Sequence, residues 1–249
     1  MRKMLVALLL LTATPALAEE KLSAVDLSVR TAMTFKVNDA ALQKLLPTGF
    51  VMNPPAAGPT KGANLAITLI DYLMVQDAEG KSLPPRTTVA INIPSKKTAT
   101  GEAVGLVIGG FILEAGAPGA YFNFGASKIS VNRQSHTVEG KSIIDETWDI
   151  KANDGSALEV AVQFERGTPT RGKVETKIHS GTKPEFYRIY KFEQATDVVR
   201  SAALGIDRAT KFTIKASGPM LTPLFDGTQQ VMSIISVPYY SRSIYVPTM

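Results

Sequence analysis

The stretch VGLVIGGFIL, residues 104–113, is an unbroken apolar run that contains three glycines. Glycine is a poor helix former, and within a strand it marks a sharp bend or a close approach of backbones. An apolar run of this length between turn residues is typical of a strand buried on both faces. We therefore expect residues 104–113 to form a buried, strongly curved strand rather than a helix.

Most of the remaining chain also reads as strands. The expected strands span residues 65–72, 87–93, 141–150, 157–164, 173–179, 186–192, 210–216 and 231–237. Turn residues separate them, and Asn153-Asp154-Gly155 between two of them is a typical hairpin sequence. The number of strands predicts an α+β protein built on a strongly curved, largely antiparallel β-sheet, cone-like or barrel-like, that encloses a pocket.

Two segments have helical spacing. In residues 38–46, Asn38 or Asp39 can cap the first turn, the leucines fall on one face, and Pro47 follows. Residues 193–204 have a weaker pattern, with apolar side chains at helical spacing before Gly205. We expect a helix in each segment.

The N-terminus, MRKMLVALLLLTATPALA, has the three parts of a cleavable export signal. Arg2 and Lys3 are its positive start, residues 4–11 its apolar run, and Ala16-Leu17-Ala18 the small-x-small cleavage pattern. The apolar run is shorter than the ~20 residues of a membrane-spanning helix, although an uncleaved anchor is the alternative. We expect cleavage after residue 18, a periplasmic or secreted protein with no stable membrane insertion, and one domain over residues 19–249.

Composition narrows the function. The chain has 249 residues, no cysteine and a net charge of +5, to which the export signal contributes two. Its Lys and Arg residues are scattered, so we expect no nucleic-acid partner. The absence of cysteine excludes thiol catalysis, iron–sulfur clusters and thiolate zinc sites.

Common catalytic motifs are missing. His136 and His179 lie far apart and form no HxH or HExxH pattern, so no metal site is predicted. Gly125-Ala126-Ser127 is a poor substitute for a G-x-S-x-G nucleophile elbow. No Gly-rich dinucleotide fingerprint or P-loop occurs, so we expect no cofactor.

Lys128 is the candidate nucleophile. It lies in the aromatic, apolar segment AYFNFGASKI, residues 120–129, whereas Lys96-Lys97 lies in a turn-like segment. A lysine attacks carbonyls only when desolvation or a nearby cation lowers its pKa. An apolar wall around Lys128 would provide that desolvation. The alternative is a lysine at a strand edge with its amine in solvent.

Three segments together resemble the acetoacetate decarboxylase family. FKVNDAALQKLLP at 35–47 is similar to that family's early strand and helix, and FGASKI at 124–129 to its active-site lysine segment. GPMLTPLFD at 218–226 is similar to a late segment of the family. The order and spacing agree along most of residues 19–249. The resemblance implies a curved sheet around a pocket.

The resemblance also implies a site. Lys128 matches the lysine that forms a Schiff base with a β-keto acid, so that the protonated imine accepts electrons as carbon dioxide leaves. Arg30 lies within two residues of a pocket arginine, and Tyr121, Phe122 and Phe124 would line the pocket. Ile129 replaces the second lysine of the family, and Thr88 lies near an acidic position. Lys128 would therefore depend on desolvation alone.

Two functions remain open at this stage. The first is a cofactor-independent Schiff-base lyase, such as a decarboxylase, that uses Lys128 on a small keto acid or carbonyl compound. The second is a non-catalytic binding protein for a small apolar or carboxylate ligand. The aromatic tail at 238–245 is either a closing strand or an interaction surface, and a homo-oligomer is compatible with either function.

Overall fold

The computed structural model describes residues 20–84 and 86–248, so the predicted export signal at residues 1–18 lies outside the described residues. The elements are β1 (Glu20–Lys36), α1 (Asp39–Gln43), β2 (Phe50–Met52), β3 (Leu65–Asp77), β4 (Ser82–Leu83), β5 (Thr87–Lys97), β6 (Ala103–Leu113), the 3₁₀ turn η1 (Glu114–Gly116), β7 (Phe124–Val138), β8 (Lys141–Ala152), β9 (Ala157–Glu165), β10 (Thr170–Ser180), β11 (Tyr187–Ser201), β12 (Ile206–Asp207), β13 (Ala209–Ser217) and β14 (Gln230–Pro247). Within these residues, no helix is long and apolar enough to span a membrane.

Strand β6, which contains the glycine-rich run, is where the sheet forks. One edge of β6 pairs with β5, while its other edge pairs first with β10, at Gly105–Val107, and then with β7, at Gly110–Leu113. A side chain at Gly110 would collide with the carbonyl oxygen of Val89 and the ring of Phe124. Glycine is therefore required where three strands converge.

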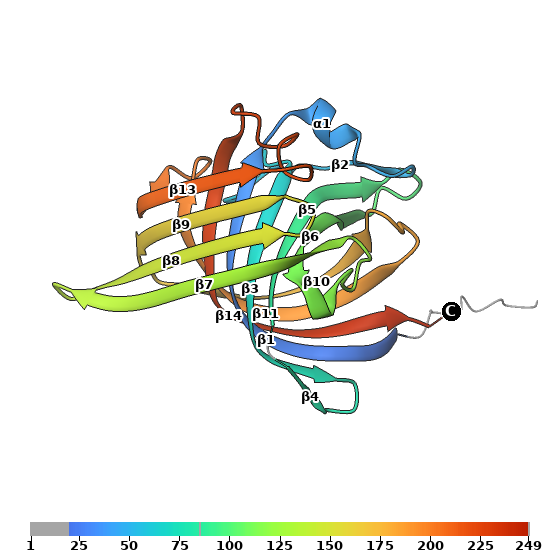
Figure 1. Ribbon diagram of the computed structural model, residues 1–249, viewed down its shortest axis with the longest axis horizontal. Helices are drawn as coiled ribbons and strands as arrows, with labels where there is room; N and C mark the ends of the chain where they lie inside the picture. Colours follow the sequence, from blue (N-terminus) through green and yellow to red (C-terminus); the bar gives the residue numbers. More distant parts are fainter. Residues whose placement is uncertain (1–19, 85, 249) are drawn as a thin grey trace, which may run out of the picture.

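The pairings of β6 close one part of the sheet into a ring. The order β6-β10-β11-β14-β1-β3-β5 returns to β6 through the β5–β6 pairing. The second branch, β7-β8-β9-β13, leaves β6 as a separate layer that lies across the ring (Figure 1). We call this layer the arm. The curved sheet expected from the sequence is confirmed.

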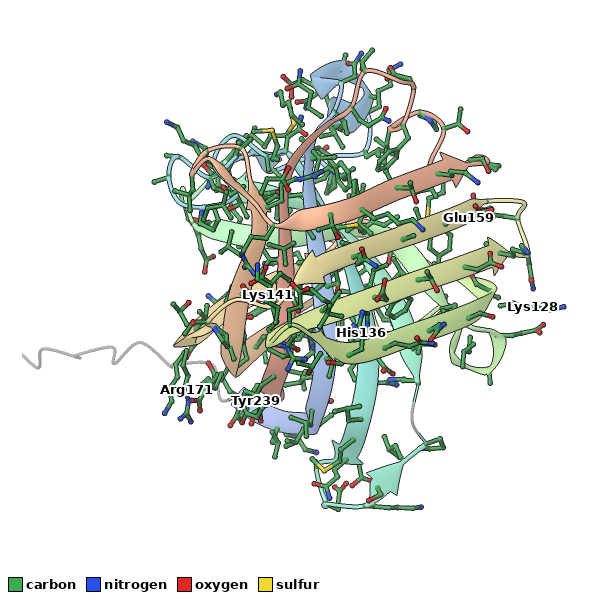
Figure 2. The ribbon with its side chains drawn as sticks, turned by 90° about the vertical axis from the view of Figure 1, so that its left-hand side faces the viewer. Lys128, His136, Lys141, Glu159, Arg171 and Tyr239 are labelled. Atoms are coloured by element: carbon green, nitrogen blue, oxygen red, sulfur yellow. The ribbon has the colours of Figure 1, made fainter. Side chains whose placement is uncertain are left out.

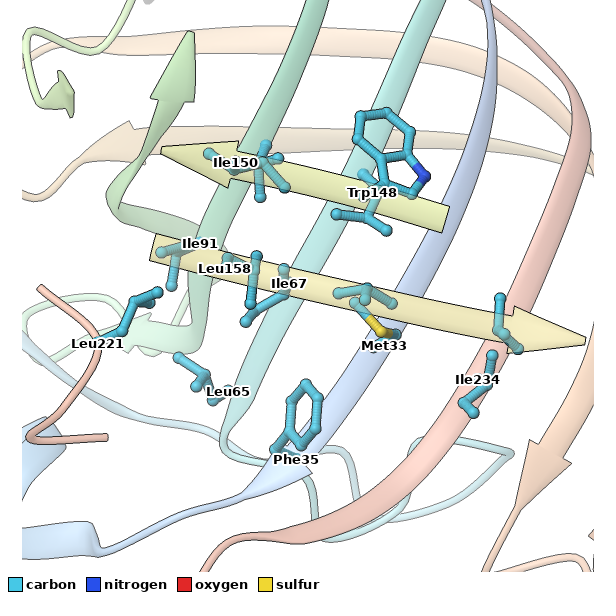
Figure 3. Packing of buried hydrophobic residues seen from close by; sticks show 14 of the residues in the cluster. Met33, Phe35, Leu65, Ile67, Ile91, Trp148, Ile150, Leu158, Leu221 and Ile234 are labelled. Carbon is cyan, nitrogen blue, oxygen red and sulfur yellow. The ribbon is translucent and has the colours of Figure 1, made fainter. Parts of the chain in front are cut away.

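The hydrophobic core lies between the arm and the outer face of the ring. Trp148 and Ile150 of β8 pack with Ile67 of β3 and Ile91 of β5 in one buried cluster (Figure 3). The same cluster includes Met33 from β1, which is fully buried. Burying such side chains contributes ~1.5–3 kcal/mol each. The ring is therefore stabilised by packing on its outer face, and its interior does not have to be filled with side chains.

The inner face of the ring carries small side chains. Ala32, Thr68 and Ala90 are register partners on β1, β3 and β5, and Gly110 of β6 continues the same row. Successive residues of a strand point to opposite faces, so the large residues that alternate with these belong to the core. The row of small residues leaves space inside the ring.

One expected helix is confirmed and the other is wrong. Asn38 caps α1, where its Oδ1 accepts hydrogen bonds from the amides of Ala40 and Ala41. Residues 193–204 belong mainly to β11, because β10 and β14 pair with its two edges. Tertiary pairing overrides a weak helical pattern here, so the protein has less helix than expected. The expected hairpin at Asn153-Asp154-Gly155 joins β8 to β9.

Candidate functional site

The ring encloses a cavity of about 910 Å³. Its lining includes four arginines and four tyrosines, beside smaller polar residues: Arg30, Arg86, Arg188 and Arg242, with Tyr72, Tyr121, Tyr190 and Tyr240. Among residues 20–84 and 86–248, no Asp, Glu, His or Lys lines it. The cavity therefore combines apolar walls with positive charge.

A buried carboxylate lies beneath two of these arginines. Asp26 is fully buried, and its Oδ2 accepts hydrogen bonds from Nε and Nη2 of Arg242 at 2.8 and 2.6 Å. Its Oδ1 lies 3.4 Å from Nη2 of Arg30. Guanidinium groups stay protonated in proteins. A single carboxylate therefore pairs with two guanidinium groups. The cluster of Asp26, Arg30 and Arg242 has one more positive than negative charge.

Arg30 is held in place by neighbours that do not neutralise it. Its Nε donates to Ser28 Oγ at 2.9 Å, and its guanidinium carbon lies 3.3 Å from the centre of the Tyr240 ring. Burial, and then the charge of Arg242, lower the pKa of Arg30. Both effects disfavour the charged form, and an anion beside Arg30 would relieve them.

Tyr121 and Tyr190 form a second polar group in the cavity wall. The Tyr121 hydroxyl donates to that of Tyr190, and the Tyr190 ring lies 4.1 Å from the guanidinium carbon of Arg242. Burial, and then Tyr190, raise the pKa of Tyr121 well above its ordinary value. Tyr121 is therefore a neutral hydroxyl at physiological pH.

The loop after β6 positions Tyr121. Its carbonyl oxygen accepts hydrogen bonds from Ser180 Oγ at 2.6 Å and Thr182 Oγ1 at 3.3 Å. The next residue, Phe122, has a φ of 63°, a left-handed conformation that is uncommon for a bulky side chain. This turn separates Tyr121, which lines the cavity, from Phe122, which is 40% exposed.

Thr88 offers a hydroxyl with no partner. It is 6% exposed, it lines the cavity, and its Oγ1 has no hydrogen bond within the described residues. Register places Thr88 beside Ile70, whose other neighbour is Arg30, so the two polar side chains lie two strands apart on one face. A buried unpaired hydroxyl is costly unless a ligand or water binds it.

The structure brings together four of the residues expected at the site. Arg30, Thr88, Tyr121 and Phe124 all line the cavity. Their role in binding a substrate remains a prediction. Phe122 does not line it; its ring packs against Phe186 instead, at 5.1 Å between ring centres.

The placement expected for Lys128 is wrong. Lys128 is exposed, and its side chain extends from the rim of the arm, away from the body of the protein (Figure 2). It lies on β7, opposite Lys151 of β8, and does not line the cavity. Ser127 is buried, so alternation along β7 directs Lys128 outward. The desolvation that would activate this amine is absent.

Sequence reasoning missed the residues that carry most of the site's charge. Asp26, Arg188 and Arg242 come from three strands that are distant in sequence, and the pairing of β14 with β1 and with β11 brings them to one part of the sheet. The one usable signal was the spacing Tyr240-x-Arg242 in the tail, since alternate residues share a strand face. The tail forms the closing strand β14, with Tyr240 and Arg242 buried.

No family model matches the sequence, and no curated protein matches it. Solved structures do. An acetoacetate decarboxylase-like enzyme from Sphingomonas wittichii RW1 is 11% identical, with a TM-score of 0.55 over 98% of this chain and 100% of that one. The acetoacetate decarboxylase of Legionella pneumophila is 11% identical, with a TM-score of 0.52 over 96% and 93%.

A third similar structure is the enduracididine biosynthesis enzyme MppR, in complex with the condensation product of pyruvate and imidazole 4-carboxaldehyde. It is 10% identical, with a TM-score of 0.53 over 93% of this chain and 90% of that one. The ring and arm thus form the acetoacetate decarboxylase-like fold, as the resemblance implied. At these identities the likeness extends to the fold and not to the chemistry.

Proposed function

We propose that this protein binds a small, largely apolar molecule through a carboxylate group in the ring cavity. The observation that carries the proposal is the charge of the Asp26 cluster: Arg30 and Arg242 share a single carboxylate inside a cavity with no acidic lining in the described residues. Charge-assisted hydrogen bonds from arginine to carboxylate are among the stronger polar contacts in proteins.

Thr88 and the apolar wall support the same ligand. The free Thr88 hydroxyl can bond a second oxygen of the ligand, and Phe124 and Ile112 offer apolar surface. A cavity of about 910 Å³ is at the upper end of the ~300–1,000 Å³ common for small-molecule sites.

A Schiff-base reaction is less well supported. It needs an amine in the cavity, and none of the lysines in residues 20–84 and 86–248 lines it. The binding function, left open by the sequence, is therefore preferred. Borohydride reduction in the presence of keto acids, read by mass spectrometry, would give no lysine adduct if the preference is right.

Calorimetric titration with carboxylic acids and their matched primary amides tests the binding proposal. The acids should bind and the amides should not. Arg30→Met should abolish binding without leaving a buried charge unpaired, because Asp26 keeps both hydrogen bonds from Arg242. Thr213→Val, an exposed change on β13, is the control. Equal affinity for acids and amides would refute the proposal.

We also propose that the protein acts outside the cytoplasm. The support is the n-region, apolar run and small-x-small pattern of residues 1–18. Intact-mass measurement of the protein from a periplasmic fraction should give a chain that begins at residue 19. A full-length chain confined to the cytoplasm would refute export.

A further inference from the structure

Arg188 lines the same cavity without a carboxylate partner. Its Nε is buried and makes no hydrogen bond in the described residues, and no ion pair to it occurs there. Its guanidinium carbon lies 5.9 Å from the ring centre of Phe186 and 6.0 Å from that of Tyr121. Aromatic faces attract a cation but do not neutralise it. Arg188 therefore brings a full positive charge to the cavity.

Arg188 is separate from the Asp26 cluster. Arg242 of β14 pairs with Phe192 of β11, and Arg188 precedes Phe192 by four residues. At ~3.3 Å per residue, the two positions lie ~13 Å apart along the strands. Between them stand Tyr190, which packs on Arg242, and its hydrogen-bond partner Tyr121. Within the described residues, Asp26 forms ion pairs with Arg30 and Arg242 and none with Arg188.

The charges inside the ring do not balance with a single anion. Arg30 and Arg242 share the carboxylate of Asp26, whereas Arg188 and the exposed Arg86 have no carboxylate partner in the described residues, so a monocarboxylate at Arg30 leaves the charge of Arg188 unmet. Arg188 is partly buried, with its Nε shielded from solvent, so water screens only part of its charge, and a second anionic group on the ligand would pair with it. From this we infer that the ligand is a dianion: two carboxylates joined by an apolar chain, one at the Arg30–Arg242 pair and one at Arg188.

This inference rests on the proposed carboxylate function and adds a second anchor to it. Titration calorimetry with straight-chain dicarboxylates from succinate to sebacate provides the test. Each diacid is compared with its monomethyl ester, which keeps the length and removes one charge. At the best length, the diacid should bind at least about tenfold more tightly than its ester, equivalent to ~1.4 kcal/mol.

Variants locate the second anchor. Arg188→Met keeps much of the apolar stem and should reduce the diacid to the affinity of its ester, while ester affinity stays unchanged. Arg166→Met removes an exposed arginine outside the cavity and should change neither. Thermal melting of each variant verifies that it is folded, and the diacid–ester comparison on the unmodified protein does not depend on any variant.

The outcomes separate the two proposals. Equal binding of diacids and esters, or an equal loss for both in Arg188→Met, overturns the second anchor and leaves carboxylate binding intact. Failure of every mono- and dicarboxylate to bind overturns carboxylate binding itself. A diacid preference that survives Arg188→Met also overturns the inference, because the second charge would then be bound elsewhere.

Discussion

Asp26 and Arg242 are cross-strand partners of β1 and β14, and Nε and Nη2 of Arg242 both donate to the same carboxylate oxygen, Oδ2. The other oxygen of Asp26 faces Arg30, so this ion pair also sets the charge of the cavity. A buried pair adds little net stability compared with apolar residues, but breaking it strands a charge. The presence of this ion pair is thus better explained by a role in the binding site than by a contribution to the stability of the core.

Replacing Asp26 should test this relationship. Asp26→Asn leaves Arg30 and Arg242 buried together without a carboxylate, and should lower the free energy of unfolding by ~3–5 kcal/mol. Urea unfolding followed by circular dichroism measures the change. Asp149→Asn breaks an ion pair to Lys151 that is about half exposed, and should leave the transition unchanged. If Asp26→Asn and Asp149→Asn changed the free energy of unfolding by similar amounts, Asp26 would not be the carboxylate that holds the two buried arginines.

Two adjacent residues of β5 should separate binding from stability. Ala90 belongs to the row of small residues and lines the cavity, so Ala90→Leu should fill the binding space and weaken ligand binding while the protein remains folded. Ile91 faces the core, so Ile91→Ala should cost ~2–5 kcal/mol of stability but leave ligand affinity intact. Calorimetry and urea unfolding of both variants measure the two effects. If Ala90→Leu lowered stability and Ile91→Ala weakened ligand binding instead, Ala90 would face the core and Ile91 the cavity, contrary to the structure.

Lys128→Met should have little effect. The side chain is exposed at the rim of the arm, away from the cavity, so neither ligand affinity nor unfolding should change beyond ~0.5 kcal/mol. Titration and thermal melting of the variant provide the measurement. A large loss of binding would return Lys128 to the site and contradict its position on β7.

His179 should make stability depend on pH. It is 2% exposed, and burial lowers the pKa of its imidazole from the ordinary 6.5; nearby Lys97 and Lys177 act in the same direction, whereas Pro184 and Glu102 oppose it. The unfolded chain therefore binds a proton more readily than the folded chain does. Stability from this group is complete above pH ~6.5 and falls as the pH drops below that value.

Unfolding measurements between pH 7 and pH 5 can isolate this contribution. His179→Phe can keep the stacking that His179 makes with Tyr187, and should flatten the loss of stability below pH ~6.5. His136→Gln, at an exposed position on β7, is the matched control and should retain the slope. An unchanged slope in His179→Phe would show that another group titrates.

Strands with clear alternation were predictable from the sequence. In the expected strands 65–72 and 87–93, alternate residues do face the core and the cavity. The run 104–113 was recognised as a curved strand because its glycines are local signals. By contrast, β1 has mixed composition and was missed, although it supplies both Asp26 and Arg30.

Lys128 shows why the site was harder to predict than the fold. The segment 120–129 is apolar on average. The face to which each side chain points, however, alternates along β7, so a shift of one residue exchanges the buried and exposed positions. Ser127 took the buried position and Lys128 the exposed one. Average hydrophobicity does not carry this information.

The sequence by itself determined the curved sheet, its glycine-rich turning strand and the cap of α1, because these depend on local properties of short segments. Only the tertiary structure decided that β6 forks, that the ring closes, and that Asp26, Arg30, Arg188 and Arg242 share one cavity. Strands distant in sequence set those contacts through register, and register depends on the whole sheet rather than on any one strand.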